Sequence, residues 1–449
     1  MNKAPNKVNA RELAIKVLQE VYSKQAYANI AMNRILDKEN ITALDRKFLT
    51  ELVYGTVKAT NTIDWIIGKF VNRPLSKIPP MIVYIMRAAC YQIMYMDKVP
   101  PSAACNEAVE LSKKYTHQGT VKFVNGVLRS IIRGTDSIEF PDITKQPIEH
   151  ISLKYHHPQW LVRQWLQDFG QEETIKLCAA NNTAPHLTIR VNTLKTNKEK
   201  LIEMLATEGI VVEQSKYADD GLIITEMKGS LADSKSFAQG LWLIQDESSM
   251  LVAQIMDAKP GSTVLDMCAA PGGKSTHIAQ YLQNDGKVLA CDIYEHKLNL
   301  VKENSSRLGI KILQTFLQNA TIYVEQFKNI ADYVLVDAPC SGLGVLRRRA
   351  DARWRKQERE LAELPDLQLS ILQNAARYLK PGGRLVYSTC TIRRQENQDV
   401  IERFLQAEPD FECEQIIHPL KQQSVREIVL YPHIDGVDGF YIVSLRKKV

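Results

Sequence analysis

Apolar residues recur every three or four positions through the first third of the chain, which is the spacing of one helix face. The clearest stretches cover 13–21, 48–53, 81–96, 103–115 and 121–132. Prolines lie between several of these stretches, and the alternation that is typical of strands is hardly visible. The pattern therefore predicts an all-α N-terminal domain over residues 1–140.

The pattern changes after a polar linker at 134–147. Further helical segments follow, and from Pro185 short apolar runs alternate with one helical stretch. In order, the candidates are a strand at 187–191, a helix at 198–207 and strands at 210–213 and 221–224. Residues 141–240 are therefore predicted to hold linker helices and a small α+β subdomain. Its Arg190 and Asn192 are expected at the surface, within reach of a substrate strand.

Strands and helices alternate from about residue 240 to the C-terminus. The strand candidates are 263–266, 287–292, 311–316, 332–337 and 383–388, and the longest helix candidate is 366–380. This alternation predicts a doubly wound, mainly parallel α/β domain of Rossmann-like topology over 241–449, with 439–447 as a late antiparallel edge strand. Ligands of such sheets bind beyond the carboxyl ends of the strands, so the residues that follow each strand are the candidates for function.

The segment TVLDMCAAPGGKS, residues 263–275, predicts a strand, a tight Gly-rich turn and the start of a helix. Gly272 and Gly273 permit positive φ and a close approach of a ligand, and the helix N-terminus offers free N–H groups. The dinucleotide fingerprint G-x-G-x-x-G is absent, and the phosphate-binding loop G-x-x-x-x-G-K-[ST] fails at its first glycine, where Cys268 stands. A turn with no ligand is the plain alternative.

A loop that binds S-adenosylmethionine (SAM) is a further possibility for this segment. Such a site needs an acid after the second strand to hold the ribose hydroxyls. Asp292 ends the segment VLACD nineteen residues after Gly273, a spacing like that of the ribose-binding acid in doubly wound folds.

Two cysteines follow later strands of the predicted sheet. Cys340 stands three residues after Asp337, and Cys390 follows Ser-Thr. A single cysteine is usually a buried small hydrophobe, but two at strand ends, beside an acid and a cofactor loop, favour covalent chemistry. A thiolate that adds to C6 of a pyrimidine turns C5 into a nucleophile for a methyl group, after which a proton leaves C5 and the thiolate is expelled. A carboxyl group near N3 favours the addition.

Several segments also resemble known families. DMCAAPGGKS (266–275), LVDAPCSGLGVLRRRAD (335–351), YSTCTIRRQEN (387–397) and QDESSMLVAQIM (245–256) are similar to the signatures of RNA cytosine-C5 methyltransferases. DRKFLTELVYGTV (45–57), VPPSAACNEAVELSKKY (99–115) and KFVNGVLRSI (122–131) resemble the helical RNA-binding domain of the antitermination factor NusB. Together the segments resemble the bacterial 16S rRNA cytosine-C5 methyltransferases of the RsmB (Sun/Fmu) type.

The resemblance implies SAM as cofactor, 16S ribosomal RNA as partner and an RNA contact by the subdomain within 141–240. It implies Cys390 as nucleophile, Cys340 as the residue that assists product release and Asp337 as a hydrogen-bond partner of the base. The implied cofactor contacts are Cys268, Ala269, Ala270, Pro271, Gly272, Gly273, Lys274, Asp292 and Asp337. Asn319 is added to them, because it stands where the family usually has an acid near the adenine and its amide still forms hydrogen bonds.

Charge and cysteine usage add to these expectations. Residues 1–140 carry 20 Lys and Arg against 12 Asp and Glu, whereas the whole chain carries 57 against 51. The basic excess suits an RNA contact at that end, although a solvated basic surface fits it equally well. The eight cysteines are scattered without metal-binding spacing, and no stretch of about 18 apolar residues or secretory signal occurs. We therefore expect a monomeric cytoplasmic protein with no metal site and no membrane contact.

Two other functions stay open at this point. A P-loop-like nucleotidase is suggested by YVLVD (333–337), which imitates a Walker B strand, and by GGKST (272–276). Cys268 counts against it, and it leaves both later cysteines unexplained. A non-catalytic RNA-binding or antitermination protein needs no cysteines at all. The combination of long motifs in the expected order favours the methyltransferase.

Overall fold

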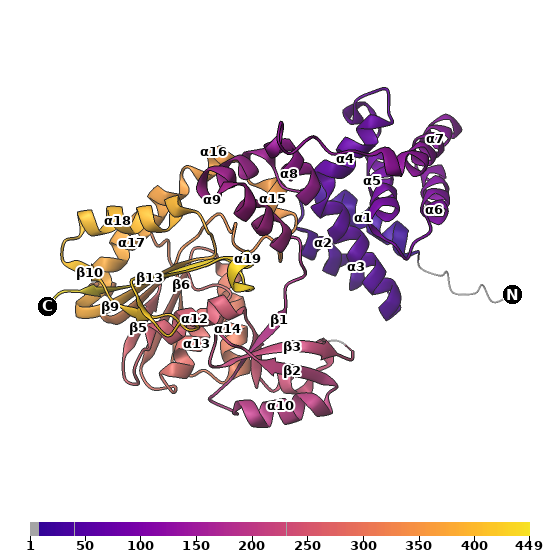
Figure 1. The fold of residues 1–449 in the computed structure, drawn as a ribbon. Helices are drawn as coiled ribbons and strands as arrows, with labels where there is room; N and C mark the ends of the chain where they lie inside the picture. Colours follow the sequence, from indigo (N-terminus) through magenta and orange to yellow (C-terminus); the bar gives the residue numbers. More distant parts are fainter. Residues whose placement is uncertain (1–8, 40, 230) are drawn as a thin grey trace. The chain divides into compact units, whose positions relative to one another are not determined.

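The computed structural model describes residues 9–39, 41–229 and 231–449 (Figure 1). Its contacts divide the chain into two compact units. The helical unit extends to Asn182 and includes residues 349–355, and the sheet unit comprises residues 183–348 and 356–449. The start of the segment inspected for a secretory signal lies outside the described residues.

The helical unit packs the apolar faces of α1 to α7 around one core (Figure 1, indigo to magenta). Its helices are α1 (Ala10–Ser23), α2 (Ala28–Leu36), α3 (Ala43–Lys58), α4 (Thr60–Lys69), α5 (Pro80–Tyr95), α6 (Pro101–Lys113), α7 (Gln118–Gly134), α8 (Pro147–Tyr155) and α9 (Gln159–Ala180). Proline occupies the first position of α5, α6 and α8, where its missing N–H would have no helical partner. The all-α fold predicted for the N-terminal domain is confirmed.

A short piece of the later chain completes the helical unit. Residues 349–355, which contain α15 (Ala352–Arg355), belong to this unit by their contacts. The side chain of Arg353 is fully buried and donates to the carbonyl oxygens of His156 at 2.8 Å and Asn181 at 3.1 Å. Burial lowers the pKa of Arg353 to about 10. The pattern of apolar residues did not predict that this segment belongs to the helical unit.

A small antiparallel sheet begins the sheet unit. Its strands are β1 (Leu187–Val191), β2 (Ile210–Gln214), β3 (Gly221–Met227) and β4 (Trp242–Ile244), in the order β2-β3-β1-β4, with helices α10 (Lys198–Thr207) and α11 (Lys235–Ala238). β1 is an inner strand, paired with β3 and β4. The surface position expected for Arg190 and Asn192 is wrong: both are fully buried, because their side chains donate to backbone carbonyl groups inside the unit.

The large sheet has eight strands within the fully described stretch 231–449. They are β5 (Thr263–Asp266), β6 (Lys287–Asp292), β7 (Leu313–Leu317), β8 (Ala331–Asp337), β9 (Leu379–Thr389), β10 (Phe411–Cys413), β13 (Glu427–Leu430) and β14 (Phe440–Lys447). A separate hairpin consists of β11 (Ile416–Ile417) and β12 (Ser424–Val425). The order is β10-β14-β9-β8-β5-β6-β7, parallel from β9 to β7. The predicted doubly wound, mainly parallel sheet is confirmed.

β14 is not the edge strand that its alternation predicted. It runs antiparallel to β9 on one side. On its other side, β13 pairs with residues 440–443 and β10 with residues 445–447. Strands as short as β10 and β13 carry too little periodicity to be seen in the sequence, so the cover over β14 could not be predicted.

Helices cover both faces of the large sheet. Helices α12 (Glu247–Met256), α13 (Gly273–Tyr281) and α14 (Glu295–Leu308) pack on one face, and α17 (Leu364–Tyr378) and α18 (Gln398–Ala407) pack on the other. The remaining short helices are α16 (Glu358–Leu361) and α19 (Pro432–Asp435). Successive strand residues serve opposite faces: Val264 joins the core under α12 and α13, and Leu265 joins the core under α17. Burial on both sides explains the continuous apolar runs of these strands.

The strand order places the switch point of the sheet beside β5. The chain continues from β5 to β6 and β7 on one side, and then returns to β8 and β9 on the other. The loops after β5 and β8 therefore leave neighbouring strands in opposite directions, which is the place where doubly wound sheets bind ligands.

Candidate active site

The loop after β5 has a turn whose backbone conformation and close packing favour glycine. Gly272 has a φ of 97°, and a Cβ atom there would lie 3.2 Å from the Cα atom of Val301 in α14. The N–H of Ala269 donates to the carbonyl oxygen of Cys291 at 2.8 Å, which ties the loop to β6. Helix α13 begins at Gly273, directly after the turn. The predicted order of strand, Gly-rich turn and helix is confirmed.

Asp266 lies beneath this loop as the last residue of β5. Its carboxylate accepts from the Ser275 hydroxyl at 2.6 Å and from the N–H of Cys268 at 3.3 Å. Burial raises the pKa of Asp266 to about 7; the bond from Ser275 opposes the shift, and the charge of Asp337 adds to it. The Cys268 thiol is kept neutral, because burial and the nearby carboxylates, that of Asp266 first, raise its pKa well above the ordinary value.

Arg190 holds the same loop from the small sheet. Its guanidinium donates to the carbonyl oxygen of Gly273, to the side-chain oxygen of Gln245 and, at 2.9 Å, to the hydroxyl of Thr276. Burial lowers the pKa of Arg190 to about 9. The small sheet thus anchors the start of α13, a role that its sequence did not indicate.

The end of β6 suits an adenosine-containing cofactor. Asp292 ends this strand, and its Oδ1 atom accepts from the N–H of Tyr294 at 3.0 Å. Ile293 follows it and Leu317 is its register partner on β7; these apolar side chains expose 52% and 61% of their surface. Ribose hydroxyls need an acceptor and an adenine ring needs apolar cover, so a carboxylate between exposed apolar side chains fits SAM.

The other predicted cofactor residues vary in exposure. Ala269 is buried, Ala270 is half-buried and Pro271 is exposed. Asn319 follows β7, where its Oδ1 atom accepts from the N–H of Thr321 at 3.0 Å and from its hydroxyl at 2.9 Å. This local turn occupies the oxygen of Asn319, and its contact with the cofactor stays a prediction.

Asp337 connects three strand ends. One carboxylate oxygen accepts from the Nζ atom of Lys274 at 2.8 Å, and the other accepts from the Ser388 hydroxyl at 2.8 Å. Burial by itself lowers the pKa of Lys274, but the charge and the hydrogen bond of Asp337, with a smaller contribution from Cys390, outweigh burial and raise it. Lys274, assigned to the cofactor loop from the sequence, therefore places its ammonium group beside Asp337 and within electrostatic reach of Cys390.

The two cysteines lie together at the ends of β8 and β9. The Sγ atoms of Cys340 and Cys390 are 3.2 Å apart. The contact with Cys390, then burial, then the negative charges of Glu396 and Asp337 raise the pKa of the Cys340 thiol well above its ordinary value. The charge of Lys274 interacts with Cys390, whereas the nearby carboxylates help to keep the Cys340 thiol neutral.

Two buried residues that the sequence reasoning missed hold both cysteine loops. Glu396 accepts from the N–H of Ser341 at 2.8 Å, and Asn397 accepts from the Thr389 hydroxyl at 2.6 Å. Both lie within YSTCTIRRQEN (387–397), the segment that resembles a family signature. Their presence in the same signature as Cys390 was the feature of the sequence that could have identified them as site residues.

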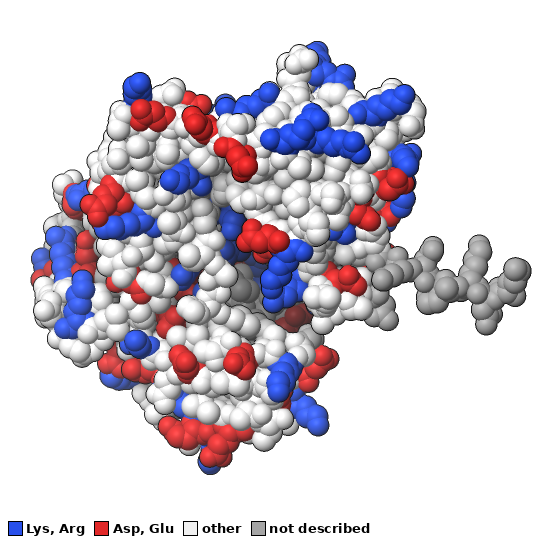
Figure 2. Space-filling model, turned by 45° about the vertical axis from the view of Figure 1, so that its right-hand side comes forward, with Lys and Arg blue, Asp and Glu red and all other residues white. Residues whose placement is uncertain are grey.

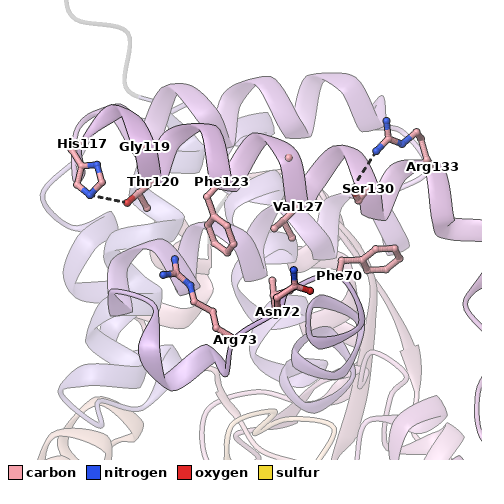
Figure 3. Close-up of a pocket in the computed structure, with 12 residues that line it drawn as sticks. Phe70, Asn72, Arg73, His117, Gly119, Thr120, Phe123, Val127, Ser130 and Arg133 are labelled. Atoms are coloured by element: carbon pink, nitrogen blue, oxygen red, sulfur yellow. Dashed lines mark hydrogen bonds between the residues drawn. The ribbon is translucent and has the colours of Figure 1, made fainter.

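A separate pocket of about 900 Å³ lies in the helical unit, between the residues after α4 and helix α7 (Figure 3). Its lining consists of Phe70, Val71, Asn72, Arg73, His117, Gly119, Thr120, Phe123, Gly126, Val127, Ser130 and Arg133. The Arg73 guanidinium lies over the Phe123 ring, 4.6 Å from its centroid. All lining residues are described, and they include two arginines but no acid.

The described residues show neither a membrane helix nor a metal cluster. No helix in 9–39, 41–229 or 231–449 is long and apolar enough to cross a membrane. Over the same ranges, no group of three or more His, Cys, Asp or Glu side chains is arranged to hold a metal ion. The cysteines of the sequence are all free thiols.

Comparison with known families matches three successive segments of the chain. Residues 253–446 match the family described as 16S rRNA methyltransferase RsmB/F. Residues 8–133 match the NusB family, and residues 157–229 match the ferredoxin-like domain of RsmF/B-like methyltransferases. The all-α, ferredoxin-like and Rossmann-like folds thus follow one another along the chain.

Individual relatives extend the likeness over the full length. A protein of Bacillus subtilis described as probable ribosomal RNA small subunit methyltransferase B is 40% identical, and the alignment covers 98% of this chain and 99% of that protein. The crystal structure of PH0851 matches with a TM-score of 0.83 at 28% identity, over 99% of this chain and 100% of that chain. NSun6 from Pyrococcus horikoshii with the SAM analogue SFG matches with a TM-score of 0.57 at 26% identity, over 65% of this chain and 98% of that chain.

Proposed function

We propose a reaction from one established premise: the chain belongs to the RsmB/F family of 16S rRNA methyltransferases. It is a SAM-dependent rRNA methyltransferase. We propose that it methylates C5 of a cytosine in 16S ribosomal RNA, and that Cys390 carries the reaction through a covalent bond to C6. The observation that carries this proposal is the pair of thiols 3.2 Å apart, with a cation near one and carboxylates near the other.

Cys390 is the proposed nucleophile because Lys274, held beside Asp337, is a cation that interacts with it. In the first step, the thiolate forms a bond to C6, and the C5–C6 double-bond electrons shift toward C5 and the N3 edge of the ring. Asp337, held by Lys274 and Ser388, is the proposed hydrogen-bond partner of the base. It would orient the cytosine by accepting a hydrogen bond from the amino group of the base.

Cys340 is proposed to act in the last steps. After C5 has gained its methyl group, the C5 proton leaves, the C5–C6 double bond re-forms, and its formation expels the Cys390 sulfur as a thiolate. Cys340 lies 3.2 Å from the leaving sulfur and is held as a neutral thiol. As a neutral thiol it is placed to give its proton to the leaving Cys390 sulfur and so assist elimination, while the C5 proton passes to water. The neutral form does not compete for C6.

The residues after β5 and β6 are proposed to hold the cofactor. SAM supplies an electrophilic methyl group when it is bound. The Gly-rich loop, residues 268–274, would receive it at the turn before α13. Asp292 would accept hydrogen bonds from the ribose hydroxyls, and Ile293 and Leu317 would cover the adenine ring.

The helical unit is proposed to supply much of the affinity for RNA. Residues 1–140 hold the basic excess of the chain, and Figure 2 shows Lys and Arg side chains over the upper part of this unit. The pocket of Figure 3 combines Arg73 and Arg133 with the ring of Phe123, and the space beside Gly126 is open. Proteins usually bind single-stranded RNA with cationic side chains that contact the phosphates and with aromatic rings on which the bases stack.

The alternatives that the sequence left open do not account for the chain. Family membership over nearly the full length excludes the P-loop-like nucleotidase as its main activity. A non-catalytic antitermination protein would not need two thiols at the ends of adjacent strands. A monomer in the cytoplasm remains our prediction.

Bisulfite sequencing of 16S rRNA from cells with and without the gene tests this function. Methylation at C5 protects a cytosine from conversion, so we expect one site to be protected only when the gene is present. Identical protection in both strains contradicts C5 methylation of this RNA.

A further inference from the structure

Glu396 and Asn397 are adjacent buried residues between the cysteine loops and α18. Their exposed fractions are 0% and 1%. Glu396 ends a 3-10 turn (Arg394–Glu396), and Asn397 directly precedes α18. Each side chain is bonded to a different cysteine loop: Glu396 to the loop that follows β8 and Asn397 to the loop that follows β9.

Glu396 acts on the loop of Cys340. Its Oε2 atom accepts from the N–H of Ser341 at 2.8 Å and from the Gln368 amide at 3.1 Å. The same amide nitrogen donates to the carbonyl oxygen of Pro339 at 3.0 Å. Pro339 and Ser341 flank Cys340, so the carboxylate and the amide together fix the backbone on both sides of this thiol.

Asn397 does the same for Cys390. Its oxygen accepts from the Thr389 hydroxyl at 2.6 Å, and its amide donates to the carbonyl oxygen of Thr391 at 3.0 Å. Thr389 and Thr391 flank Cys390, and both are fully buried. One side chain therefore holds the Thr389 side chain and the Thr391 backbone, one on each side of the second thiol.

We propose that Glu396 and Asn397 are the positioning residues of the two thiols, Glu396 for Cys340 and Asn397 for Cys390. The inference rests on the proposed covalent methylation of cytosine. It goes further by predicting that two neighbours in the sequence control different steps: Asn397 controls the attack on C6, and Glu396 controls release of the product. Removing either side chain leaves buried polar groups of one cysteine loop without a partner, and the thiol of that loop is then less well oriented. We expect this to slow the step that depends on that thiol by about ten-fold or more.

The charge of Glu396 gives a second, electrostatic consequence. Cys340 faces Cys390, Glu396 and Asp337. Arg393 pairs with Glu396 at 3.2 Å, and Lys274 pairs with Asp337. Replacing the carboxylate of Glu396 by an amide removes a negative charge from beside the Cys340 thiol, which lowers its pKa. The pH dependence of product release should then move to lower pH, whereas that of the attack should not move.

The experiment compares full-length Glu396→Ala, Glu396→Gln and Asn397→Ala with the wild type. Gln398→Ala is the matched control, because Gln398 is the next residue and its amide bonds to Glu427 at 2.9 Å, not to a cysteine loop. A 16S rRNA transcript made with 5-fluorocytidine traps the adduct, since the C5 substituent cannot leave as a proton. The rate of trapping reports the attack, and the adduct that persists on an ordinary transcript with SAM reports release. Calorimetric SAM affinity and thermal melting verify that each variant is folded.

We expect Asn397→Ala to trap at least about ten-fold more slowly than the wild type. Glu396→Ala should trap at nearly the wild-type rate but accumulate adduct on the ordinary transcript. Glu396→Gln, whose oxygen can still accept from Ser341, should accumulate less and should show the shift of release to lower pH. The Gln398→Ala protein should behave as the wild type.

Equal defects in trapping for both positions overturn the division of roles, as does a Glu396→Ala protein that releases product normally. If a variant does not fold, the milder Glu396→Gln and an Asn397→Ser variant decide by the same two rates. Failure of the wild type itself to trap RNA overturns the covalent mechanism, which is a different result from failure of this inference.

Discussion

The Nζ atom of Lys274 lies 2.8 Å from the Oδ2 atom of Asp337, a contact that joins the Gly-rich loop after β5 to the cysteine loop after β8. The ammonium group also lies 5.2 Å from the centre of the Phe440 ring on β14. Because this cation also interacts with Cys390, the loop proposed to receive the cofactor places a positive charge near the proposed nucleophile. The proposed cofactor loop and the proposed nucleophile are therefore linked through one side chain.

Replacing Lys274 by methionine should slow the attack by Cys390. Loss of a nearby cation raises the pKa of a thiol, and a charge at close range shifts a pKa by roughly one to three units. At pH 7.5 we expect trapping of 5-fluorocytidine RNA to slow by about ten-fold, with recovery as the pH is raised. Lys274→Arg keeps the charge and is the control. A pH profile that is the same in Lys274→Met and the wild type would count against this role.

Asp292→Ala should weaken SAM binding. The substitution leaves the ribose hydroxyls without a charged acceptor, which costs roughly 1.5–3 kcal/mol, or about ten-fold or more in the dissociation constant. Titration calorimetry measures the change. Glu295, an exposed acid three residues later, provides the control Glu295→Ala. Unchanged affinity in Asp292→Ala removes Asp292 from the cofactor site.

Asp266 should make the stability of the cofactor-free protein depend on pH. Its pKa is about 7 in the folded chain against 3.8 for an ordinary aspartate. The folded state thus holds this proton more tightly, so the group's stabilising contribution is complete below about pH 4 and is lost as the pH rises through 7.

Asp266→Asn removes the cost of burying that charge. We expect urea denaturation to show a free energy of unfolding about 1–3 kcal/mol higher than the wild type at pH 8, and a much smaller difference at pH 5. A difference that does not change between the two pH values contradicts the raised pKa.

Long motifs in a regular strand–helix alternation made most of the fold predictable. The strands that end in Asp266, Asp292 and Asp337 stand out as apolar runs that end in an acid. Because such strands are expected to be parallel, the three acids are predicted to lie at one edge of the sheet. The contacts between segments far apart in the sequence could not be predicted in this way. Arg190 looks like a surface residue of a short strand, and only the fold shows that its buried guanidinium holds Gly273.

The same limit applied to the chemistry of the site. The residues after each strand were predictable as candidates, because parallel strands end at one edge of the sheet. The 3.2 Å contact of the two thiols and the pairing of Lys274 with Asp337 depend on how the loops fold back. Glu396 and Asn397 were overlooked because their hydrogen bonds to the cysteine loops are visible only in the folded chain.

Replacing Arg73 and Arg133 by alanine should weaken RNA binding without affecting SAM. Each phosphate contact that is lost should lower the slope of log affinity against log salt by about one. Arg46→Ala, an exposed position of α3 outside the pocket, is the control. Point variants are preferable to removal of the helical unit, since Trp354 donates to the carbonyl oxygen of Val57 at 2.8 Å. An unchanged salt slope argues against the pocket as an RNA site.

Denaturing gels of Cys390→Ala and Cys340→Ala, incubated with labelled 16S rRNA and SAM, test the central claim most directly. Cys390→Ala lacks the sulfur that bonds to C6, so it should be inactive and give no shifted band. Cys340→Ala should transfer the methyl group but stall before elimination, leaving protein covalently joined to methylated RNA. A stalled adduct in Cys390→Ala and none in Cys340→Ala would reverse the roles, and full turnover by both variants would contradict the covalent mechanism.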